Sequence, residues 1–198
     1  MKRNRFYDAI YPVFSALVHL LFRIRVTGRD GIPEGGAIVC ANHSSWVDPI
    51  IIMVSVPRSV QLHAMAKQEI MTWPFVGWLA RKCGVFGVDR GHADIAAVKT
   101  ALSYLKGGEK LLIFPEGTRV SAEDAASAKS GVAMMAVRSG VPIIPMYLQS
   151  GKKLFHRTHV AIGEPIYPKI AGRRGTAEEY HAIAEDVMRR VYSLGGGE

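Results

Sequence analysis

The sequence predicts a single α/β domain with a largely parallel sheet flanked by helices, preceded by an apolar N-terminal helix. Size supports this prediction, because 198 residues with 48% apolar content suit one globular domain with a sizeable core. Order supports it as well, because short β-branched runs alternate with helix-length segments, as in parallel α/β sheets. No linker rich in Pro, Gly or Ser divides the chain. We therefore expect an N-terminal helix over residues 1–23 and one folded domain over residues 24–198.

The N-terminal segment is mostly apolar over residues 6–22, but Asp8, Pro12 and His19 interrupt it. Because a membrane-spanning helix needs about 20 predominantly apolar residues, this segment is too short and too broken to cross a bilayer. Basic residues flank it on both sides, an arrangement typical of a helix that lies in an anionic membrane interface. We expect this interfacial placement for residues 1–23. An ordinary buried helix and a signal or spanning segment are the alternatives.

The charge of the chain limits its partners. A net charge of +8 favours negative ones, namely nucleic acid, anionic lipid or an acidic carrier protein. Nucleic acid fits least, because its binders interleave aromatic side chains with Lys and Arg, whereas the aromatic residues here concentrate in residues 6–22 and 73–78. The second segment is a further candidate for lipid contact, although core packing explains it equally well. Cys40 and Cys83 lie in apolar runs and are expected to be reduced, as in the cytosol.

Five short apolar runs have the composition of buried strands. They cover residues 37–41, 60–66, 84–88, 110–114 and 141–148. The clearest helix has apolar side chains at spacings of three and four over residues 95–105 and ends at a Gly-Gly pair that suits a C-terminal cap. A second helix covers residues 131–138. The last opens with a capping box formed by Thr176 and Glu179.

A histidine and an aspartate follow the first predicted strand. Residues 37–41 continue directly into Asn-His-Ser-Ser-Trp-Val-Asp-Pro, residues 42–49. Open α/β sheets place their sites at the carboxyl ends of strands. Asp48 before Pro49 has the pattern of a helix N-cap, so we expect the carboxylate to face His43 across a turn. The carboxylate would hold one ring nitrogen of His43 while the other nitrogen acts as a general base on a hydroxyl. The alternative is that Asp48 only caps its helix and His43 is a loop histidine.

Two further strand ends carry basic side chains. The fourth predicted strand ends in Phe-Pro-Glu-Gly-Thr-Arg, residues 114–119. There Gly117 lets backbone N–H groups approach an anion, Thr118 can donate a hydrogen bond, and Arg119 presents a fork that fits phosphate. The third strand ends in Val-Asp-Arg-Gly and brings Arg90 to a sheet edge. These residues suit an oxyanion or phosphate cradle; a turn with a solvated arginine and a surface Asp–Arg pair are the alternatives.

These segments together resemble the four ordered sequence blocks of the glycerolipid acyltransferases of the His-x4-Asp type. The blocks here are residues 42–48, 84–90, 114–119 and 141–145. The resemblance extends over roughly residues 25–164, and its first and third blocks are the specific ones. It implies an enzyme that transfers a fatty acyl group from acyl-CoA or acyl carrier protein to the free hydroxyl of lysophosphatidic acid. The product would be phosphatidic acid, made in phospholipid biosynthesis.

The resemblance also implies roles for single residues. His43 would deprotonate the acceptor hydroxyl and Asp48 would orient its ring, without an acyl-enzyme intermediate. The other site residues would bind the substrate phosphate, and they are Arg90, Glu116, Gly117, Thr118, Arg119 and Lys129. No metal and no cofactor beyond the acyl donor is implied. The expected partners are the lysophospholipid, the acyl thioester, an anionic membrane surface and acyl carrier protein as one potential donor, at the cytoplasmic face of the cell membrane.

Other classes of protein fit the sequence less well. A serine hydrolase would need a Gly-x-Ser-x-Gly elbow, which the chain lacks. A zinc enzyme would need a ligand cluster, but His156 and His159 have no His-Glu-x-x-His motif or cysteine pair beside them. Two alternatives stay open. One is an acyltransferase that uses another lysophospholipid or a lyso-aminolipid, and the other is a non-catalytic lipid-surface binding protein, against which the presence of His43 and Asp48 argues.

Overall fold

The fold is described from a computed structural model that describes residues 5–89, 94–116, 130–170, 172 and 175–196. Its strands are β1 (Ile24–Thr27), β2 (Ala37–Ala41), β3 (Leu62–Lys67), β4 (Val85–Val88), β5 (Lys110–Ile113), β6 (Ile143–Leu148) and β7 (Thr158–Ile162). They form one seven-stranded sheet in the order β1-β7-β6-β2-β5-β3-β4. Neighbouring strands are parallel except β6 and β7, which are antiparallel. The predicted single-domain α/β fold with a largely parallel sheet is confirmed.

The five predicted strands are present, with small shifts at their ends, whereas β1 and β7 were not predicted. Both lie at one side of the sheet, where β1 is the edge strand and pairs only with β7. In β1 half-buried and exposed positions alternate over only four residues. So short a run gives little periodic signal in the sequence, and its pairing places Ile24 opposite the distant Thr158. These strands depend on long-range pairing more than on local pattern.

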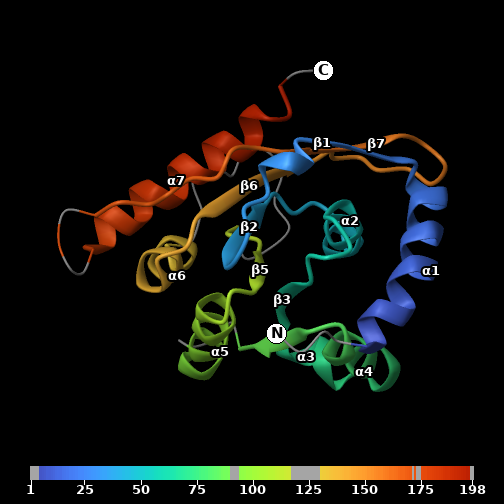
Figure 1. Ribbon diagram of the computed structural model, residues 1–198, viewed down its shortest axis with the longest axis horizontal. Coiled ribbons are helices and arrows are strands. Elements are labelled where there is room, and N and C mark those ends of the chain that lie inside the picture. Colours follow the sequence, from blue (N-terminus) through green and yellow to red (C-terminus); the bar gives the residue numbers. More distant parts are fainter. Residues whose placement is uncertain (1–4, 90–93, 117–129, 171, 173–174, 197–198) are drawn as a thin grey trace.

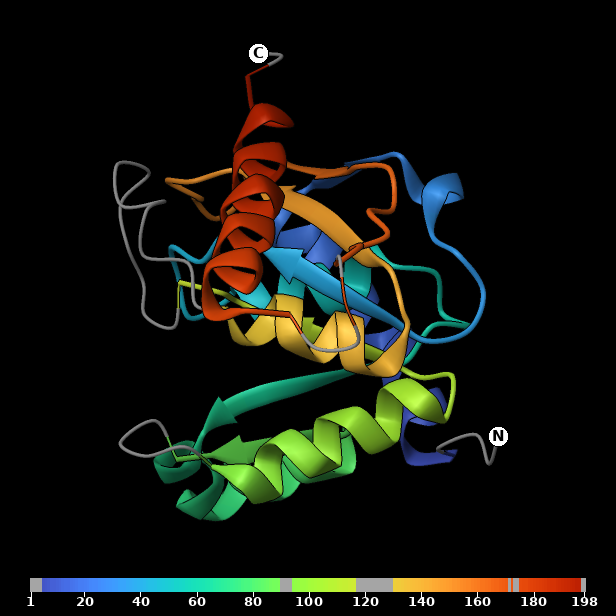
Figure 2. The same ribbon diagram turned by 90° about the vertical axis from the view of Figure 1, so that its left-hand side faces the viewer.

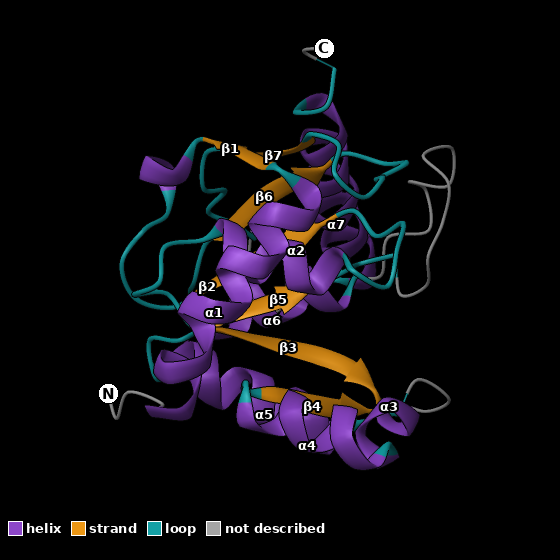
Figure 3. Cartoon of the chain, turned by 90° about the vertical axis from the view of Figure 1, so that its right-hand side faces the viewer, coloured by secondary structure: helices purple, strands orange, loops and turns teal. Residues whose placement is uncertain are grey.

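Helices cover both faces of the sheet. They are α1 (Arg5–Phe22), α2 (Asp48–Ser55), α3 (Gln68–Thr72), α4 (Pro74–Lys82), α5 (Ile95–Lys106), α6 (Gly131–Ser139) and α7 (Ala177–Ser193), with a 3-10 turn at Arg29–Gly31. α1 and α2 pack on one face, and α5, α6 and α7 pack on the other (Figures 1 and 2). α3 and α4 contact each other and β4, at the far edge of the sheet (Figure 3).

The central strand β2 is buried on both faces. Val39 belongs to the apolar cluster that includes Ile51 of α2, whereas Ile38 and Cys40 belong to the cluster that includes Met188 of α7. Strands buried on both sides are apolar at every position instead of alternating, which explains the sequence Ala-Ile-Val-Cys-Ala. This strand therefore gives a rigid support to the polar residues that follow it.

The end of α5 and the start of α7 agree with the sequence signals. The Thr176 hydroxyl accepts a hydrogen bond from the Glu179 backbone N–H, and the Glu179 carboxylate accepts one from the Thr176 N–H at 2.8 Å, so the predicted capping box is confirmed. α5 ends at Lys106 with Gly107 as its C-cap, and Gly108 follows with a left-handed φ of 81° that glycine adopts without strain. Local sequence therefore sets these boundaries.

The N-terminal helix forms as predicted, over Arg5–Phe22. Tyr7, Val18 and Phe22 are buried against the domain, and the Tyr11 hydroxyl donates to the Val56 carbonyl oxygen at 3.0 Å. Its opposite side carries apolar residues that face solvent, with Val13 75% exposed. Among the described residues no helix is both long and apolar enough to span a bilayer.

Candidate active site

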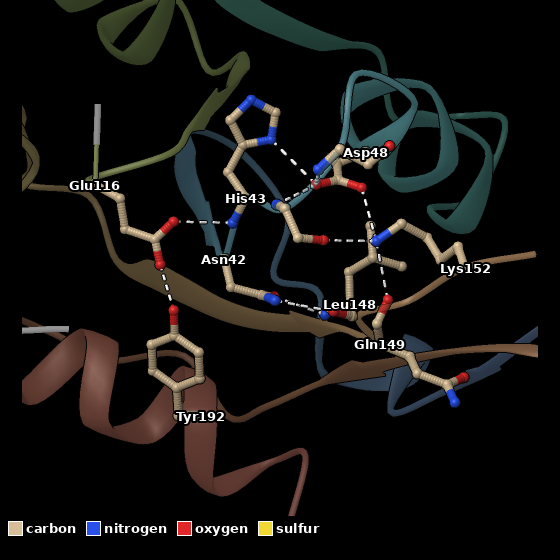
Figure 4. A network of polar contacts seen from close by, with 10 residues as sticks. Asn42, His43, Asp48, Glu116, Leu148, Gln149, Lys152 and Tyr192 are labelled. Atoms are coloured by element: carbon tan, nitrogen blue, oxygen red, sulfur yellow. Dashed lines mark hydrogen bonds and ion pairs between the residues drawn. The ribbon is translucent and has the colours of Figure 1, made fainter. Parts of the chain in front are cut away.

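Three neighbouring strands support the candidate site. β6, β2 and β5 are adjacent and parallel, so their carboxyl ends lie at the same edge of the sheet. His43 follows β2, Glu116 follows β5, and Lys152 follows β6. Asp48 reaches the same place from the start of α2, and Tyr192 reaches it from α7 (Figure 4). We call these five residues the dyad corner.

The two residues of the His-x4-Asp motif are in contact. His43 Nδ1 lies 3.1 Å from Asp48 Oδ2, as predicted. The imidazole stacks on the Phe114 ring, with centroids 4.2 Å apart, which fixes its plane. This contact makes Nδ1 the protonated nitrogen, because a carboxylate only accepts. Nε2 then carries a lone pair and points away from Asp48, on a side chain that is 16% exposed (Figure 4).

The Asp48 carboxylate accepts several hydrogen bonds from the loop that precedes α2. Its side chain is fully buried, and Oδ2 also accepts from the backbone N–H groups of Ser44 and Ser45 at 2.6 and 2.7 Å. The predicted N-cap role is wrong, since Val47 occupies that position and the carboxylate turns back onto the residues before the helix. Pro49 does stand in the first turn of α2, where its missing N–H costs nothing. The carboxylate therefore shapes the His43 turn instead of capping α2.

Two opposing effects set the proton affinity of Asp48. Burial disfavours the charged form and by itself would raise the pKa of this carboxyl. Hydrogen bonds from His43 and Lys152, the Lys152 charge and the Ser45 N–H favour the carboxylate, and together they hold the pKa of Asp48 below its ordinary value. Asp48 is therefore ionised at neutral pH and accepts the Nδ1 proton.

Glu116 lies beneath His43 and is 3% exposed. Its Oε2 accepts from the His43 backbone N–H at 3.0 Å, and its Oε1 accepts from the Tyr192 hydroxyl. Burial raises the pKa of Glu116, although the bonds from Tyr192 and His43 oppose the rise. Both oxygens are thus occupied by the protein. The structure places this predicted phosphate ligand in a supporting position, where an acceptor-only carboxylate holds the His43 backbone.

Asn42 ties the site to the sheet. Its side-chain amide donates to the Leu148 carbonyl oxygen at 2.9 Å and accepts from the Leu148 N–H at 2.8 Å. The residue is 3% exposed, so both bonds form away from water. The amide extends the pairing of β2 and β6 by one step and fixes the backbone that leads into His43. The arrangement is a positioned imidazole base at a sheet edge, suited to removing a proton from a hydroxyl.

Comparison with known proteins places the chain in a family. A model of the Acyltransferase family matches residues 23–149. The chain is 32% identical over 177 residues to the 1-acyl-sn-glycerol-3-phosphate acyltransferase of Bacillus subtilis, covering 86% of this chain and 87% of that protein. This chain belongs to the acyltransferase family. Its fold is also similar to the crystal structure of the 1-acyl-sn-glycerophosphate acyltransferase PlsC from Thermotoga maritima, with a TM-score of 0.69 and 26% identity over 100% of this chain and 85% of that one.

Relatives of this acyltransferase differ in their acceptors. The chain is 34% identical over 128 residues to the lyso-ornithine lipid O-acyltransferase of Pseudomonas aeruginosa, which covers 64% of this chain and 47% of that protein. The chain thus spans about half the length of that relative. The named relatives share O-acyl transfer and differ in the lipid that carries the hydroxyl.

Most of the predicted phosphate ligands of this acyltransferase lie outside the described residues. These are Arg90, Gly117, Thr118, Arg119 and Lys129. Their role stays a prediction, and of the predicted phosphate set only Glu116 has a described position. Within the described ranges no group of three or more His, Cys, Asp or Glu side chains could hold a metal ion.

Sequence reasoning missed three residues of this site. Asn42 stands inside the motif, but its polar side chain there did not by itself indicate a bond to β6. Lys152 and Tyr192 are far from the motif in sequence, 108 positions from Ser44 and 76 positions from Glu116 respectively. Lys152 follows Gln-Ser-Gly and stands beside a second lysine, and Tyr192 lies in the last turn of a helix, so neither has a local signal that points to its partner. Their partners become visible only when β6 and α7 are placed beside β2.

Proposed function

We propose that this acyltransferase moves a fatty acyl group from an acyl thioester to the free hydroxyl of lysophosphatidic acid, giving phosphatidic acid. The observation that carries the proposal is the His43 imidazole, held by Asp48 through Nδ1 and turned outward through Nε2 at the sheet edge. The acceptor is named from the relative in Bacillus subtilis, which matches most of this chain. Acyl-CoA and acyl carrier protein are the two candidate donors, and no other cofactor is invoked.

In the proposed reaction, His43 Nε2 accepts the hydroxyl proton and later donates it to the leaving sulfur. The hydroxyl proton of the acceptor moves to Nε2 while the hydroxyl oxygen attacks the thioester carbonyl carbon. A C–O bond forms and the C–S bond breaks, and the leaving sulfur takes the proton from the imidazolium. Asp48, ionised and hydrogen-bonded to Nδ1, stabilises the imidazolium that exists between these transfers. General-base catalysis of this kind contributes about 10²- to 10⁴-fold.

A thiol-release assay tests the proposal. Purified protein is mixed with lysophosphatidate in detergent micelles and, in parallel reactions, with acyl-CoA or with acylated acyl carrier protein, and free thiol and phosphatidic acid are measured together. We expect thiol release that depends on the acceptor, at one phosphatidic acid per thiol. Release without an acceptor would indicate a hydrolase, and lipid binding without release would indicate the non-catalytic alternative. Replacing lysophosphatidate with lyso-ornithine lipid tests the second acceptor class, which the relative in Pseudomonas aeruginosa motivates.

We also propose that the enzyme acts as a peripheral or monotopic protein at the cytoplasmic face of an anionic membrane, where acyl-CoA and acyl carrier protein are accessible. Among the segments that expose large apolar side chains, the two with four each lie at α1 and α4, and we call them together the apolar rim. Its members are Val13, Phe14, Leu17 and Leu20 on α1, and Trp73, Phe75, Val76 and Trp78 at α4. The Phe6 and Trp78 rings meet edge to face at 5.4 Å, so the two segments are joined.

The apolar rim has the composition of an interfacial surface. Phe75 is 70% exposed and Leu20 is 66% exposed, which is costly for a surface that faces only water. Tryptophan is favoured where apolar and polar media meet, and the net charge of +8 attracts anionic headgroups. α1 and α4 are both seen from one side of the molecule in Figure 3. Residues 1–23 would thus share the membrane contact with α4.

Extraction experiments test the membrane proposal. Full-length protein is mixed with vesicles of phosphatidylglycerol and phosphatidylcholine and sedimented. We expect binding that increases with the anionic fraction and release by alkaline carbonate. Resistance to carbonate like that of a spanning protein would contradict the peripheral placement. Equal binding to neutral vesicles would contradict the role of charge.

A further inference from the structure

Lys152 follows β6 and places its ammonium group inside the dyad corner. The side chain is 3% exposed. Its Nζ lies 2.9 Å from Asp48 Oδ1, 2.9 Å from the Ser44 hydroxyl oxygen and 2.9 Å from the Gln149 carbonyl oxygen (Figure 4). An ammonium group has three N–H donors, and three oxygens surround this one. Lys152 is thus fully engaged by the protein.

The Lys152 side chain is buried, although lysine is almost never buried unless it is paired, because its charge is strongly hydrated in water. The next residue, Lys153, is exposed and shows the ordinary behaviour. Lys152 instead forms an ion pair with Asp48, whose side chain is itself fully buried. The two charges compensate each other, and this cation, together with the hydrogen bonds from His43 and Ser45, keeps the buried Asp48 carboxyl ionised.

The contacts place Lys152 and His43 on different oxygens of Asp48. Lys152 bonds to Oδ1 of Asp48, whereas His43 bonds to Oδ2 of the same carboxylate. Figure 4 shows the ammonium and the imidazole on different sides of Asp48. No donor on Nζ is left for a lipid phosphate. Its bond to the Ser44 hydroxyl also fixes the turn whose backbone holds Oδ2.

We propose that Lys152 is a positioning residue for the general base, a cation that fixes the orientation and charge of Asp48 and thereby sets the pH range in which His43 accepts a proton. This inference rests on the proposed function, because it assumes that His43 is the base. It adds a third member, Lys152, to the His43–Asp48 pair. Lys152 acts through Asp48 and does not touch the substrate.

The charges around His43 determine the sign of the effect. The described charged groups that face it are Asp48 at Nδ1, Lys152 behind Asp48, and Glu116 below its backbone, itself bonded to Tyr192. A nearby cation disfavours protonation of the pair formed by His43 and Asp48. Without Lys152, the pair keeps its proton to a higher pH. The acid limb of the pH profile of kcat then moves upward.

Three variants test the inference in detergent micelles. Lys152→Met removes the charge and keeps an apolar stem, Lys152→Arg keeps the charge, and Lys153→Met is the matched control on the exposed neighbour. For Lys152→Met we expect kcat to fall about 30-fold or more, KM to stay within about threefold, and the acid limb to rise by about one pH unit. Lys152→Arg should leave the limb in place. Lys153→Met should match the wild type.

A structural role alone would give a different result. It would lower kcat equally at every pH and leave the acid limb unmoved, which would overturn the inference. Unchanged kcat in Lys152→Met would overturn it as well. A large rise in the KM for the acceptor at constant kcat would point to substrate contact and would also contradict it.

A double variant covers the case in which Lys152→Met fails to fold. Asp48→Asn and Asp48→Asn/Lys152→Met are compared, since removing both buried charges avoids an unpaired one. If Lys152 acts only through Asp48, the double variant should lie within about threefold of Asp48→Asn. A further loss of tenfold or more would overturn the inference. His43→Ala separates the two proposals: if it keeps activity the proposed base is wrong, whereas loss in His43→Ala without loss in Lys152→Met overturns only the role of Lys152.

Discussion

The dyad corner and the apolar rim invert the usual distribution of residues in opposite ways. In the dyad corner, charged groups are buried: Asp48 is fully buried, and the Lys152 side chain is 3% exposed. In the apolar rim, large apolar groups are exposed, with Val13 at 75% and Phe75 at 70%. Folding alone favours neither arrangement, because burial of charge and exposure of apolar surface both cost stability.

The two regions offset these costs differently. The dyad corner does so internally, since each buried oxygen of Asp48 and Glu116 has a partner within the chain. The apolar rim has no such partner in the described residues beyond ring contacts such as that of Phe6 with Trp78. The dyad corner, whose charges are paired within the chain, should keep its geometry whether or not lipid is present. The apolar rim should instead depend on contact with a lipid surface. Chemistry and membrane contact should therefore be separable by mutation.

The largest effect is expected from His43→Ala. Removing the proposed base should lower turnover by about 10³-fold or more, because both general-base catalysis and the hydrogen-bonded geometry are lost. Vesicle binding and the thermal unfolding temperature should change little, since the imidazole is partly exposed and its loss leaves Asp48 paired with Lys152. Turnover is measured by thiol release. A variant with near-wild-type turnover would end the proposed mechanism.

A smaller effect is expected from Arg119→Ala, in the sequence block Phe-Pro-Glu-Gly-Thr-Arg, residues 114–119. The resemblance assigns Arg119 to the substrate phosphate, and a hydrogen bond to a charged group contributes about 1.5–3 kcal/mol. The specificity constant for lysophosphatidate should therefore fall about 10- to 150-fold. That for the acyl donor should change far less. Equal losses for both substrates would indicate a donor-binding role or misfolding, and values within about twofold of wild type would make Arg119 a surface residue.

The apolar rim is tested by Phe75→Ala/Trp78→Ala. Loss of two aromatic side chains that contact lipid should weaken vesicle binding by about tenfold or more, given about 1.5–3 kcal/mol for each fully buried apolar side chain. Activity on micellar substrate should stay within about twofold, because the dyad corner is unchanged. Tyr167→Ala is the matched control, an aromatic residue 64% exposed elsewhere on the chain. Equal vesicle binding by variant and wild type would remove α4 from the membrane contact.

The smallest effect is expected from Tyr192→Phe, which removes the hydroxyl bonded to Glu116. The pKa of Glu116 is already raised by burial, so ionised Glu116 costs stability above that pKa, and protonation relieves the cost as pH falls. The variant should lose about 3–10 °C in Tm at pH 8 and less at pH 5. Asp48 does not interfere, because its pKa is below its ordinary value. A loss that is the same at both pH values would show that the hydroxyl does not stabilise the charged form.

The sequence alone determined the parts of this protein that local pattern controls. The strands β2 to β6 and the helices α5, α6 and α7 follow from apolar runs, periodicity and caps, because these signals lie within short stretches of sequence. The dyad was predictable for the same reason: five positions and one turn separate His43 from Asp48. The family followed from the order of the motifs.

Only the tertiary structure decided which distant residues complete the site. Lys152 meets Asp48 because β6 lies beside β2, and Tyr192 meets Glu116 because α7 packs across the same strands. The Asp48 carboxylate bonds to the preceding turn instead of capping α2, because buried N–H groups and an ammonium surround it. These contacts depend on desolvation and on strand order. The spacing of residues in the sequence determines neither desolvation nor strand order. The charges that surround Asp48 and Glu116 are therefore defined only in the folded chain.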